Sequence, residues 1–438
     1  MNTYGVIIGV LYIGLVGSST TKEERPESQK NDQYRRRALS LKKARDREDA
    51  RVRKALAQPG ADPSAATAVP APVAVTPGPA GQIPQARKDP AKKAPGSSAP
   101  LKSIIPGARR FARSLLGHMA AQKKTLLLSP FSLHTALAAT TAGAEGATAS
   151  QLHRALGAGS MGDAYHATMK SLLSRVRTMG GGGVLSMQNR LELSKITLKK
   201  SYLDFVKAHY GMTVTAGKAV QPQVDVINEV SFRGTWLYAF PKALTRRRAF
   251  YNKGTTKKMV PVMTLKSTFS QAADPLFRAL VLPYKGGHFE MLVVLPASRD
   301  GLKKVLTAVH GGALDKLHYY KRNLELRFPK MTLAQKVRLV EALKAMGVRE
   351  AFDSKAARFG KMNHRLFIHD VTQKLKVVVE EKGTSAKAAT VVRLRTMSVD
   401  RPLQDPRYIE FAVDHPFLFI IRTVTTKLPI FMGVVRTL

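Results

Sequence analysis

The chain has no cysteine among its 438 residues, which excludes disulfide bonds, thiolate metal ligands and a cysteine nucleophile together. It has no Asn-x-Ser/Thr sequence, so we expect no N-linked glycosylation. Acidic residues are scarce: 30 Asp and Glu stand against 71 Lys and Arg, which gives a formal net charge of +41. A protein this basic should concentrate polyanions or anionic surfaces around it.

Several signatures of enzymes are also missing. No Gly-x-Ser-x-Gly sequence is present to position a nucleophilic serine. The glycine run at residues 180–183 lacks the Lys and Ser or Thr of a phosphate-binding loop. The histidines are scattered, without the spacing of metal ligands. We therefore expect a protein that is not an enzyme and that uses no cofactor or metal.

The first 106 residues differ from the rest in composition. The apolar run at residues 4–17 is shorter than the about 20 residues that a membrane span needs. Val16 and Ser18 are small at the two positions recognised in signal cleavage, so residues 1–18 are interpreted as a secretory signal and the protein as extracellular. Residues 19–106 are basic and rich in Pro and Ala, which predicts a disordered extension. About 32 of the net positive charges remain on residues 107–438.

The remaining residues predict a single α+β domain, because helical and strand patterns are mixed and the strands are mostly antiparallel. Apolar residues at helical spacing predict helices at 108–121, 132–141, 149–156 (with Thr148 as N-cap), 165–178, 198–210, 302–309 and 337–346. Strands are predicted at 126–128, 184–193, 224–232, 324–328 and 375–379, within 259–296, and on both sides of 423–428.

The most informative stretch lies at residues 380–398. It begins with two acidic residues and Gly383, continues through small residues, and ends in β-branched and basic ones. Side chains alternate between the two faces of a strand. As a strand, the stretch would place Thr384, Ala386, Ala388, Thr390, Val392 and Leu394 on a small or apolar face and Ser385, Lys387, Ala389, Val391, Arg393 and Arg395 on a largely polar one. It is therefore suited to a sheet, although its basic end suits an exposed loop.

This stretch resembles the hinge and reactive-centre loop of the serpins. Four further blocks are similar to that family: Ser129-Pro130-Phe131-Ser132; Asn228 with Phe232, Gly234 and Trp236; Pro283-Tyr284-Lys285-Gly286 with residues 291–296; and Asp414-His415-Pro416-Phe417 with residues 429–433. The five blocks occur in family order across about residues 108–438. The resemblance implies a serpin domain over residues 107–438, with about eight helices around three mostly antiparallel β-sheets and an exposed reactive-centre loop.

The resemblance implies that the protein inhibits serine proteases as a suicide substrate. The protease cleaves the loop and forms an acyl-enzyme, and the cleaved loop then inserts into the main sheet as a new strand. The hinge residues that would begin this insertion are Glu381, Gly383, Thr384, Ala386, Ala388 and Ala389. The region of the sheet that must open is expected to contain Ser129, Ser132, Asn228, Trp236 and Gln373.

The bond that the protease attacks is predicted by counting from Gly383. The family spacing places Met397 on the acyl side and Ser398 on the leaving side, and Met suits the apolar primary pocket of a chymotrypsin-like or elastase-like protease. A shift of two residues would instead place Arg395 and Thr396 at the bond and favour a trypsin-like protease. The length of the loop allows both alternatives.

Two departures from the family pattern bear on function. The sequence passes almost directly from residues 212–215 to residues 221–225, so the helix that covers the main sheet in the family is missing. We expect apolar sheet surface to be exposed there or covered by another segment, such as the N-terminal extension. The buried histidine of the family falls on Gln373, which can form hydrogen bonds but cannot titrate.

These departures leave a second hypothesis open, a non-inhibitory serpin that binds a polyanion or a protein. The basic residues that could bind a glycosaminoglycan or another polyanion are Arg246, Arg247, Arg248, Lys257 and Lys258 in one cluster and Lys316, Lys321 and Arg322 in another. Nothing indicates specific nucleic-acid binding, because no nucleic-acid fold signature accompanies these residues. We expect a monomer.

Overall fold

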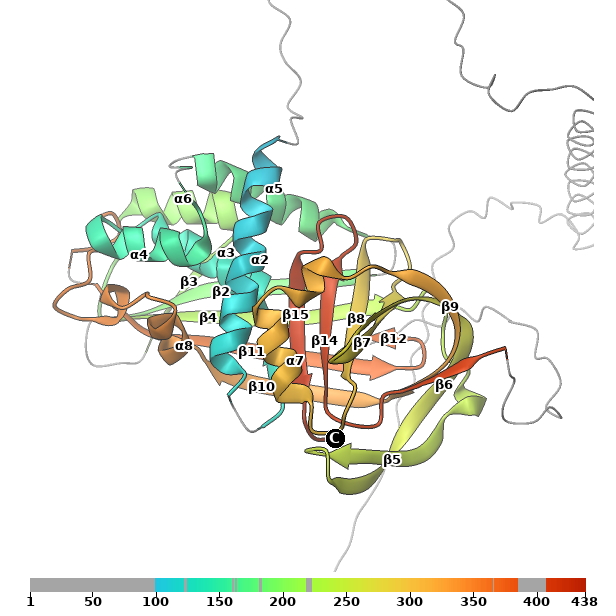
Figure 1. Ribbon diagram of the computed structural model, residues 1–438. Coiled ribbons are helices and arrows are strands. Elements are labelled where there is room, and N and C mark those ends of the chain that lie inside the picture. The colour runs from blue at the N-terminus through green and yellow to red at the C-terminus, as the bar shows by residue number, and fades with distance from the viewer. Residues whose placement is uncertain are drawn as a thin grey trace, which may run out of the picture. The chain divides into compact units, whose positions relative to one another are not determined.

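A computed structural model describes residues 99–121, 124–159, 161, 164–180, 183–217, 223–364, 366–384 and 407–438 (Figure 1). The α-helices of this part of the chain are α2 (Ala99–Met119), α3 (Pro130–Thr141), α4 (Gly146–Leu156), α5 (Ala164–Thr178), α6 (Lys200–Tyr210), α7 (Leu302–His310) and α8 (Val340–Ala345). Short 3-10 helices follow as η1 (Lys242–Leu244), η2 (Ala313–Lys316) and η3 (Glu350–Phe352).

The strands form two sheets. The six-stranded sheet has the order β10 (Met331–Arg338), β11 (Ile368–Glu380), β12 (Gly383–Thr384), β4 (Gln223–Thr235), β2 (Gly183–Ser194) and β3 (Thr213–Ala216). The nine-stranded sheet has the order β1 (Leu126–Leu128), β15 (Pro429–Val435), β14 (Phe417–Thr423), β8 (Phe289–Pro296), β7 (Phe277–Pro283), β6 (Thr256–Asp274), β9 (Tyr320–Pro329) and β13 (Ile409–Ala412), with β5 (Arg246–Asn252) on β6. The α+β class is confirmed. Three sheets were expected, and two of them are joined by β6 into the single nine-stranded sheet.

Most predicted elements are confirmed to within a few residues, and three differ. α2 begins at Ala99, well before residue 108, because Ile104 and Ile105 extend its buried face and Pro106 is tolerated inside it. β10 was not predicted as a strand: it overlaps the predicted helix 337–346 only at Val337 and Arg338, α8 forms the rest of that helix, and pairing with β11 sets the strand. Thr148 is not the N-cap of α4, which is Glu145; Thr148 is buried and donates a hydrogen bond to Glu350 (3.2 Å).

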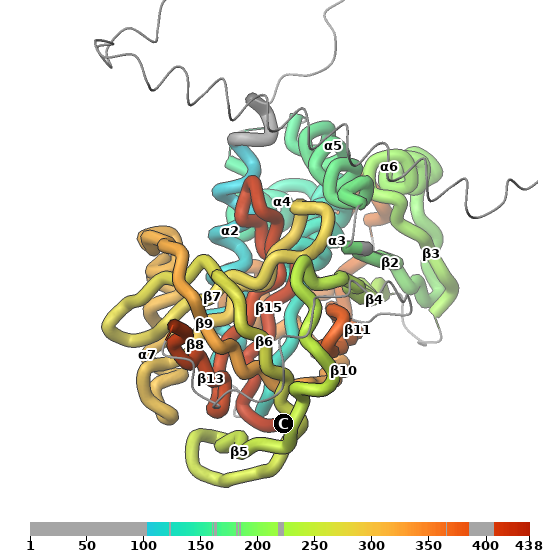
Figure 2. The backbone as a smooth tube through the Cα atoms, turned by 90° about the vertical axis from the view of Figure 1, so that its right-hand side faces the viewer, coloured from blue at the N-terminus to red at the C-terminus, as the bar shows by residue number. Residues whose placement is uncertain are grey.

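The core lies between the two sheets and the helices. α3 is buried along its whole length and packs against β2, β4 and β15. Figure 1 shows α4, α5 and α6 grouped beyond α3, and Figure 2 shows β5 at the opposite end of this domain from α5 and α6. On β4 the buried residues alternate strictly, from Val224 to Phe232, so one face of the strand is turned to α3. The opposite face of the sheet has no helix on it among the described residues.

The missing helix is explained by chain length, because only residues 217–222 separate β3 from β4. The expected apolar exposure on this outer face is wrong. Side chains that share the outer face include Gln188, Arg190, Glu229, Ser231, Lys336, Arg338, Lys374 and Lys376. Arg190 and Lys374 both bind the Glu229 carboxylate, at 3.0 and 3.1 Å. A face built from ion pairs and hydroxyls is stable in water and requires no cover.

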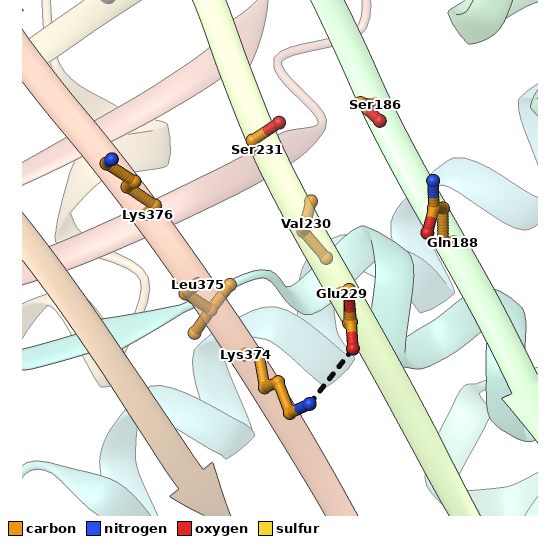
Figure 3. Close-up of a pocket in the computed structure, with 8 residues that line it drawn as sticks. All are labelled: Ser186, Gln188, Glu229, Val230, Ser231, Lys374, Leu375 and Lys376. Carbon is orange, nitrogen blue, oxygen red and sulfur yellow. Dashed lines mark hydrogen bonds and ion pairs between the residues drawn. The ribbon is translucent and has the colours of Figure 1, made fainter. Parts of the chain in front are cut away.

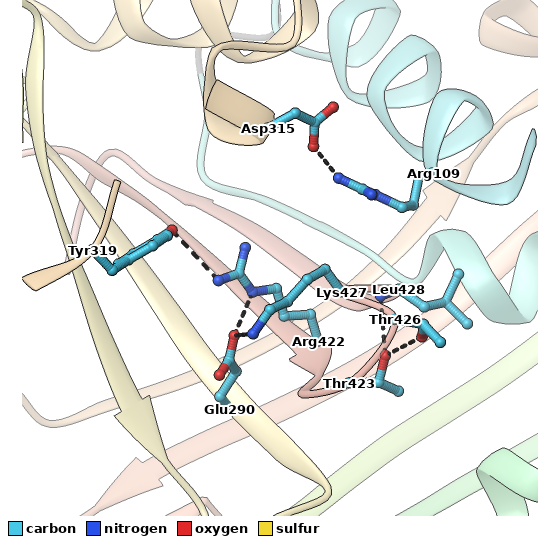
Figure 4. Close-up of polar contacts among 9 residues, drawn as sticks. All are labelled: Arg109, Glu290, Asp315, Tyr319, Arg422, Thr423, Thr426, Lys427 and Leu428. Carbon is cyan, nitrogen blue, oxygen red and sulfur yellow. Dashed lines mark hydrogen bonds and ion pairs between the residues drawn. The ribbon is translucent and has the colours of Figure 1, made fainter. Parts of the chain in front are cut away.

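A buried ion pair fixes one end of the nine-stranded sheet (Figure 4). Arg422 of β14 lies beside Glu290 of β8 in register and binds its carboxylate at 2.7 Å, and Lys427 binds the same oxygen at 2.8 Å. Tyr319 accepts a further hydrogen bond from Arg422 at 3.4 Å. Because removing one partner would leave a buried charge, this cluster holds β8 and β14 together.

Candidate functional site

The site of interest is the seam between β4 and β11 in the six-stranded sheet. The two strands are parallel and are paired from Val224 with Ile368 to Ser231 with Lys376. Beyond that point they separate, and β12 lies between them, antiparallel to both. Gly383 is opposite Glu380 and Thr235, and Thr384 is opposite Val379 and Gly234. At this end of the sheet, β4 and β11 are therefore already separated by one strand, over the length of two residues.

Gly383 is required at this position for two reasons. Its φ is +151°, in a region that side chains disfavour, and a β-carbon there would lie 1.9 Å from the carbonyl oxygen of Gly234. Thr384 follows with its side chain buried, and its hydroxyl is 2.8 Å from the hydroxyl of Tyr284. Burial raises the pKa of Tyr284, so this phenol stays protonated and forms a neutral hydrogen bond.

Trp236 covers the open end of the seam. Its indole nitrogen donates to the carbonyl oxygen of Glu380 at 3.0 Å, and its backbone nitrogen donates to that of Lys382 at 3.0 Å. The indole stacks on Tyr284 with ring centroids 4.5 Å apart. Trp236 therefore belongs to the hinge end of the seam, whereas the other residues predicted for sheet opening lie further along it.

Glu381 anchors the hinge to segments that adjoin β9 and β5. Its carboxylate accepts hydrogen bonds from Lys330 at 2.9 Å and from Thr245 at 3.0 Å, and its carbonyl oxygen accepts one from the backbone of Phe240 at 2.9 Å. Burial opposes ionisation of Glu381, but the hydrogen bonds, first that of Lys330, outweigh it and place its pKa below the ordinary value. The carboxylate is therefore charged at neutral pH.

Replacing Glu381 with glutamine should lower the free energy of unfolding by about 1–3 kcal/mol at pH 7, the usual cost of losing a hydrogen bond to a charged, buried group. Because the folded-state pKa is lowered, this contribution is present above the unfolded-state pKa and disappears as the pH falls through the folded-state pKa. Urea unfolding from pH 7 down to pH 3 should show the wild type converging on the variant. The control is Glu341→Gln. The Glu341 carboxylate is 85% exposed where it binds Lys344, so this substitution should change the free energy of unfolding little at any pH.

A row of buried amides crosses the seam beneath its closed part. Asn189, Asn228 and Gln373 are side by side on β2, β4 and β11. Gln373 donates to Asn228 at 2.5 Å and to the carbonyl oxygen of Ser129 at 3.0 Å, and it accepts from the backbone of Ser129 at 3.1 Å. Asn228 also donates to Ser132 and to Asn189. Separation of β4 from β11 must break the Gln373–Asn228 hydrogen bond.

The structure thus brings together Ser129, Ser132, Asn228 and Gln373, four of the residues proposed for sheet opening, and places further residues beside them. Asn189 was detectable as an amide on the otherwise apolar face of a predicted strand. Tyr284 stood in a block already noted for its similarity. Lys330 and Thr245 carried no local signal, because only the tertiary fold brings them to Glu381.

The predicted reactive bond lies outside the described residues. Residues 385–406 contain Ala386, Ala388 and Ala389 of the hinge and both alternatives for the bond, Met397–Ser398 and Arg395–Thr396. The described chain resumes at Arg407 and forms β13, which is parallel to β9. Glu410 of β13 binds Arg327 of β9 at 2.6 Å, so the far end of this segment is tied to the nine-stranded sheet.

The basic candidates are distributed over two places. Arg246, Arg247, Arg248, Lys257 and Lys258 lie in the β5–β6 ribbon, where the register places Arg246, Arg248 and Lys258 on one side and Arg247 and Lys257 on the other. Lys321 and Arg322 pair with Ser270 and Phe269 near the other end of β6, about 23–43 Å along the strand from the first cluster at 3.3 Å per residue, and Lys316 ends η2. The two clusters do not converge into one surface.

No described helix is both long and apolar enough to cross a bilayer. In the same part of the chain, no group of three His, Asp or Glu residues is arranged to hold a metal ion.

Comparisons with known proteins agree with this architecture. The family model described as Serpin (serine protease inhibitor) matches residues 106–229 and 219–438. Iripin-8 of Ixodes ricinus is 30% identical over 370 residues, which cover 74% of this chain and 91% of the relative. Intracellular coagulation inhibitor 2 of Tachypleus tridentatus is 28% identical over 391 residues, covering 79% and 93%.

Solved structures share the fold. Serpin48 of the insect Tenebrio molitor superposes with a TM-score of 0.68 at 22% identity, covering 77% of this chain and 98% of the other. Native protease nexin-1, solved with heparin, superposes with a TM-score of 0.65 at 20% identity, covering 77% and 99%.

Proposed function

The chain belongs to the serpin family of serine protease inhibitors, and we propose that it inhibits its target as a suicide substrate. The observation that supports this most directly is β12, because the first residues of the hinge already form a strand between β4 and β11. A strand that begins in the seam can lengthen along it. The serine protease supplies the catalytic groups, and the chain supplies the substrate loop and the sheet that accepts it.

The proposed reaction starts as ordinary proteolysis. The serine hydroxyl of the protease attacks the carbonyl carbon of Met397, an ester forms, the amide bond to Ser398 breaks, and the proton passes through the protease histidine to the amine of Ser398. The segment up to Met397 is then free at one end. Its insertion between β4 and β11 carries the ester-linked protease along the sheet before water hydrolyses the ester.

The energy for this movement comes from the new strand. Insertion replaces the direct pairing of β4 with β11 by two new antiparallel pairings, and it buries the small face of the loop. Each additional hydrogen bond contributes about 0.5–1.5 kcal/mol, so a strand of a dozen residues supplies on the order of 10 kcal/mol. Melting of the cleaved protein should therefore occur at least about 10 °C higher than melting of the intact protein.

Two measurements test the proposal. The protein is mixed with chymotrypsin-like, elastase-like and trypsin-like proteases and analysed on denaturing gels, where an inhibitor gives a band at the summed mass. The melting temperature is compared before and after loop cleavage. A band together with the rise in melting temperature supports the proposal, whereas clean cleavage by every protease without either result contradicts it.

A non-inhibitory binding role is the second candidate, favoured by Gln373 and by the closed seam. The Gln373–Asn228 hydrogen bond and the Lys374–Glu229 ion pair both cross the line that insertion would open. If they hold the sheet closed after cleavage, the melting temperature will not rise and no complex will form. That result would leave binding of a polyanion or a protein as the function.

The protease class depends on which bond is cut. If Met397 is the acyl-side residue, Met397→Arg should shift the preference toward trypsin-like proteases, and Arg395→Ala should alter rates only modestly. Mass spectrometry of the released C-terminal fragment decides the register. A fragment beginning at Ser398 supports Met397, and a fragment beginning at Thr396 assigns the bond to Arg395.

We propose in addition that the folded domain binds heparin-like chains through the β5–β6 ribbon. Replacing Arg246, Arg247 and Arg248 with Ala should lower the salt concentration for elution from heparin more than replacing Arg35, Arg36 and Arg37, because only the first three lie in the ribbon beside Lys257 and Lys258, where more charges can contact one chain and release its counterions. If both triple variants lower the elution salt concentration equally, heparin is bound by the overall positive charge of the protein and not at a defined site.

The N-terminal residues support secretion of the protein, with residues 1–18 removed and residues 19–106 as an extension. A secreted product whose sequence begins at Ser19 would verify the cleavage position.

A further inference from the structure

The outer face of the six-stranded sheet has a regular arrangement of side chains. The register aligns Gln188, Glu229, Lys374 and Lys336 in one row across β2, β4, β11 and β10. The next row contains Ser186, Ser231 and Lys376. Only residues 217–222 connect β3 to β4, and among the described residues no helix covers either row.

A depression of about 280 Å³ lies over these rows (Figure 3). It is lined by Ser186 and Gln188 of β2, by Glu229, Val230 and Ser231 of β4, and by Lys374, Leu375 and Lys376 of β11. Val230 and Leu375 are neighbours in register and are buried, so their side chains turn to the inner face of the sheet and their backbone forms the floor of the depression. The polar side chains that rise around them come from all three strands.

The polar groups of the depression are mainly hydrogen-bond donors. Four of these side chains form no hydrogen bond or ion pair with any described residue: the hydroxyls of Ser186 and Ser231, the amide of Gln188 and the ammonium group of Lys376. A hydroxyl, an amide nitrogen and an ammonium group can all donate to the same acceptor. Figure 3 shows the Lys376 ammonium turned away from Ser231 and Ser186, and because Lys376 is exposed its side chain is free to turn toward them. Such a set of donors around one depression favours a ligand that accepts several hydrogen bonds.

The charges favour a negative ligand. Lys336 is directly opposite Lys374, where like charges on neighbouring strands repel, and Lys376 follows two residues later on the same face. Arg190 adds a fourth cation, and Glu229 is the one carboxylate in the depression. The Glu229 carboxylate is occupied, because it accepts hydrogen bonds from Lys374 and Arg190. The remaining positive charge is not matched by acidic side chains of the depression.

We propose that this depression binds a tetrahedral oxyanion, a sulfate or phosphate group, through the Lys376 ammonium and the Ser231 and Ser186 hydroxyls. Lys374 lies one row away and contributes its charge while it holds Glu229. The site is open because no helix in the described part of the chain covers this face of the sheet. It lies on a different surface from the β5–β6 ribbon, and it requires neither protease inhibition nor loop insertion.

The test uses the full-length, uncleaved protein without a protease, so its outcome is independent of the proposed inhibitory function. Isothermal titration with sodium sulfate, sodium phosphate and a heparin-derived disaccharide, each at constant ionic strength, should give saturable binding. Lys376→Ala should weaken the affinity about tenfold or more, since a charge-assisted hydrogen bond is lost. Ser231→Ala should weaken it less, and Lys376→Arg should retain it.

The matched control is Lys303→Ala on α7, which removes one exposed lysine from a helix away from this face. It should leave the affinity unchanged, and melting curves in chloride should show that all variants are folded. If the disaccharide binds more tightly than free sulfate, the natural source is a sulfated sugar; if phosphate binds most tightly, it is a phosphoryl group. Binding that does not saturate, or that falls equally in Lys376→Ala and Lys303→Ala, would overturn the proposal.

Discussion

Replacing Gly383 with valine should convert the protein from an inhibitor into a simple substrate. The loop would still be cleaved, because the proposed reactive bond, Met397–Ser398, lies 14 residues beyond Gly383 along the chain, but the hinge could not continue as a strand. A β-carbon at residue 383 would lie 1.9 Å from the Gly234 oxygen and 2.7 Å from the α-carbon of Thr235. Both atoms belong to the backbone of β4, so no rotation of a side chain relieves the contact.

The expected effect is large because two costs add. A non-glycine residue in a disfavoured backbone region costs about 1–3 kcal/mol, which corresponds to as much as a 100-fold slower insertion step. The backbone contact adds further strain. Since hydrolysis of the acyl-enzyme competes with insertion, gels should show cleaved protein with little or no band at the summed mass.

A valine at Gly159 is the matched control. Gly159 also has a positive φ, +58°, but a β-carbon there meets no atom within 4 Å. Gly159→Val therefore tests backbone strain alone, far from the seam in the chain, and should form the complex as the wild type does. A normal yield of complex from Gly383→Val would show that insertion does not start from the observed β12.

The parts of the site that could be predicted from the sequence are those formed by short stretches of chain. Gly383, Asn228 and Trp236 stood in blocks with a recognisable order, and the alternation of β4 indicated which side chains face inward. Gln373 was located by its distance from Gly383 along the chain, and it joins the predicted polar residues beneath the seam.

The parts that could not be predicted depend on pairing between distant segments. The polar outer face can be recognised only when β2, β4, β11 and β10 are placed in register. Each strand alone shows only the usual alternation of buried and exposed side chains. β10 was not predicted, since its Ala, Gln and Lys favour a helix locally and its pairing with β11 joins distant residues. The same holds for Lys330, whose role follows from its contact with Glu381, 51 residues further along the chain.

The observed register of β12 also predicts where every inserted residue would lie. Gly383 and Thr384 are opposite Thr235 and Gly234 on β4. Each further step along the loop moves one step back along β4, so Thr390 would lie between Asn228 and Gln373, with its hydroxyl available to both amides. Val391 would then lie opposite Ile227 on the outer face.

A disulfide can test this register, because the chain has no cysteine of its own. The double variant Ile227→Cys, Val391→Cys should form a disulfide in nearly all molecules after loop cleavage. Directly opposite residues on antiparallel strands have α-carbons about 4.5–5.5 Å apart, within the range that a disulfide accepts. Before the sheet opens, both edges of β4 at Ile227 are occupied, by Arg190 of β2 and Thr372 of β11, so the bond should not form.

The control is the pair Ile227→Cys, Ala389→Cys, which differs by two residues and keeps both side chains on the outer face. In the predicted register its α-carbons would be about 7–8 Å apart, too far for a disulfide. Mass spectrometry of cleaved, non-reduced protein should therefore detect the cross-link in the first pair and not in the second. The reverse result would mean that the loop enters two residues further than β12 indicates, and no cross-link in either pair would mean that the seam stays closed.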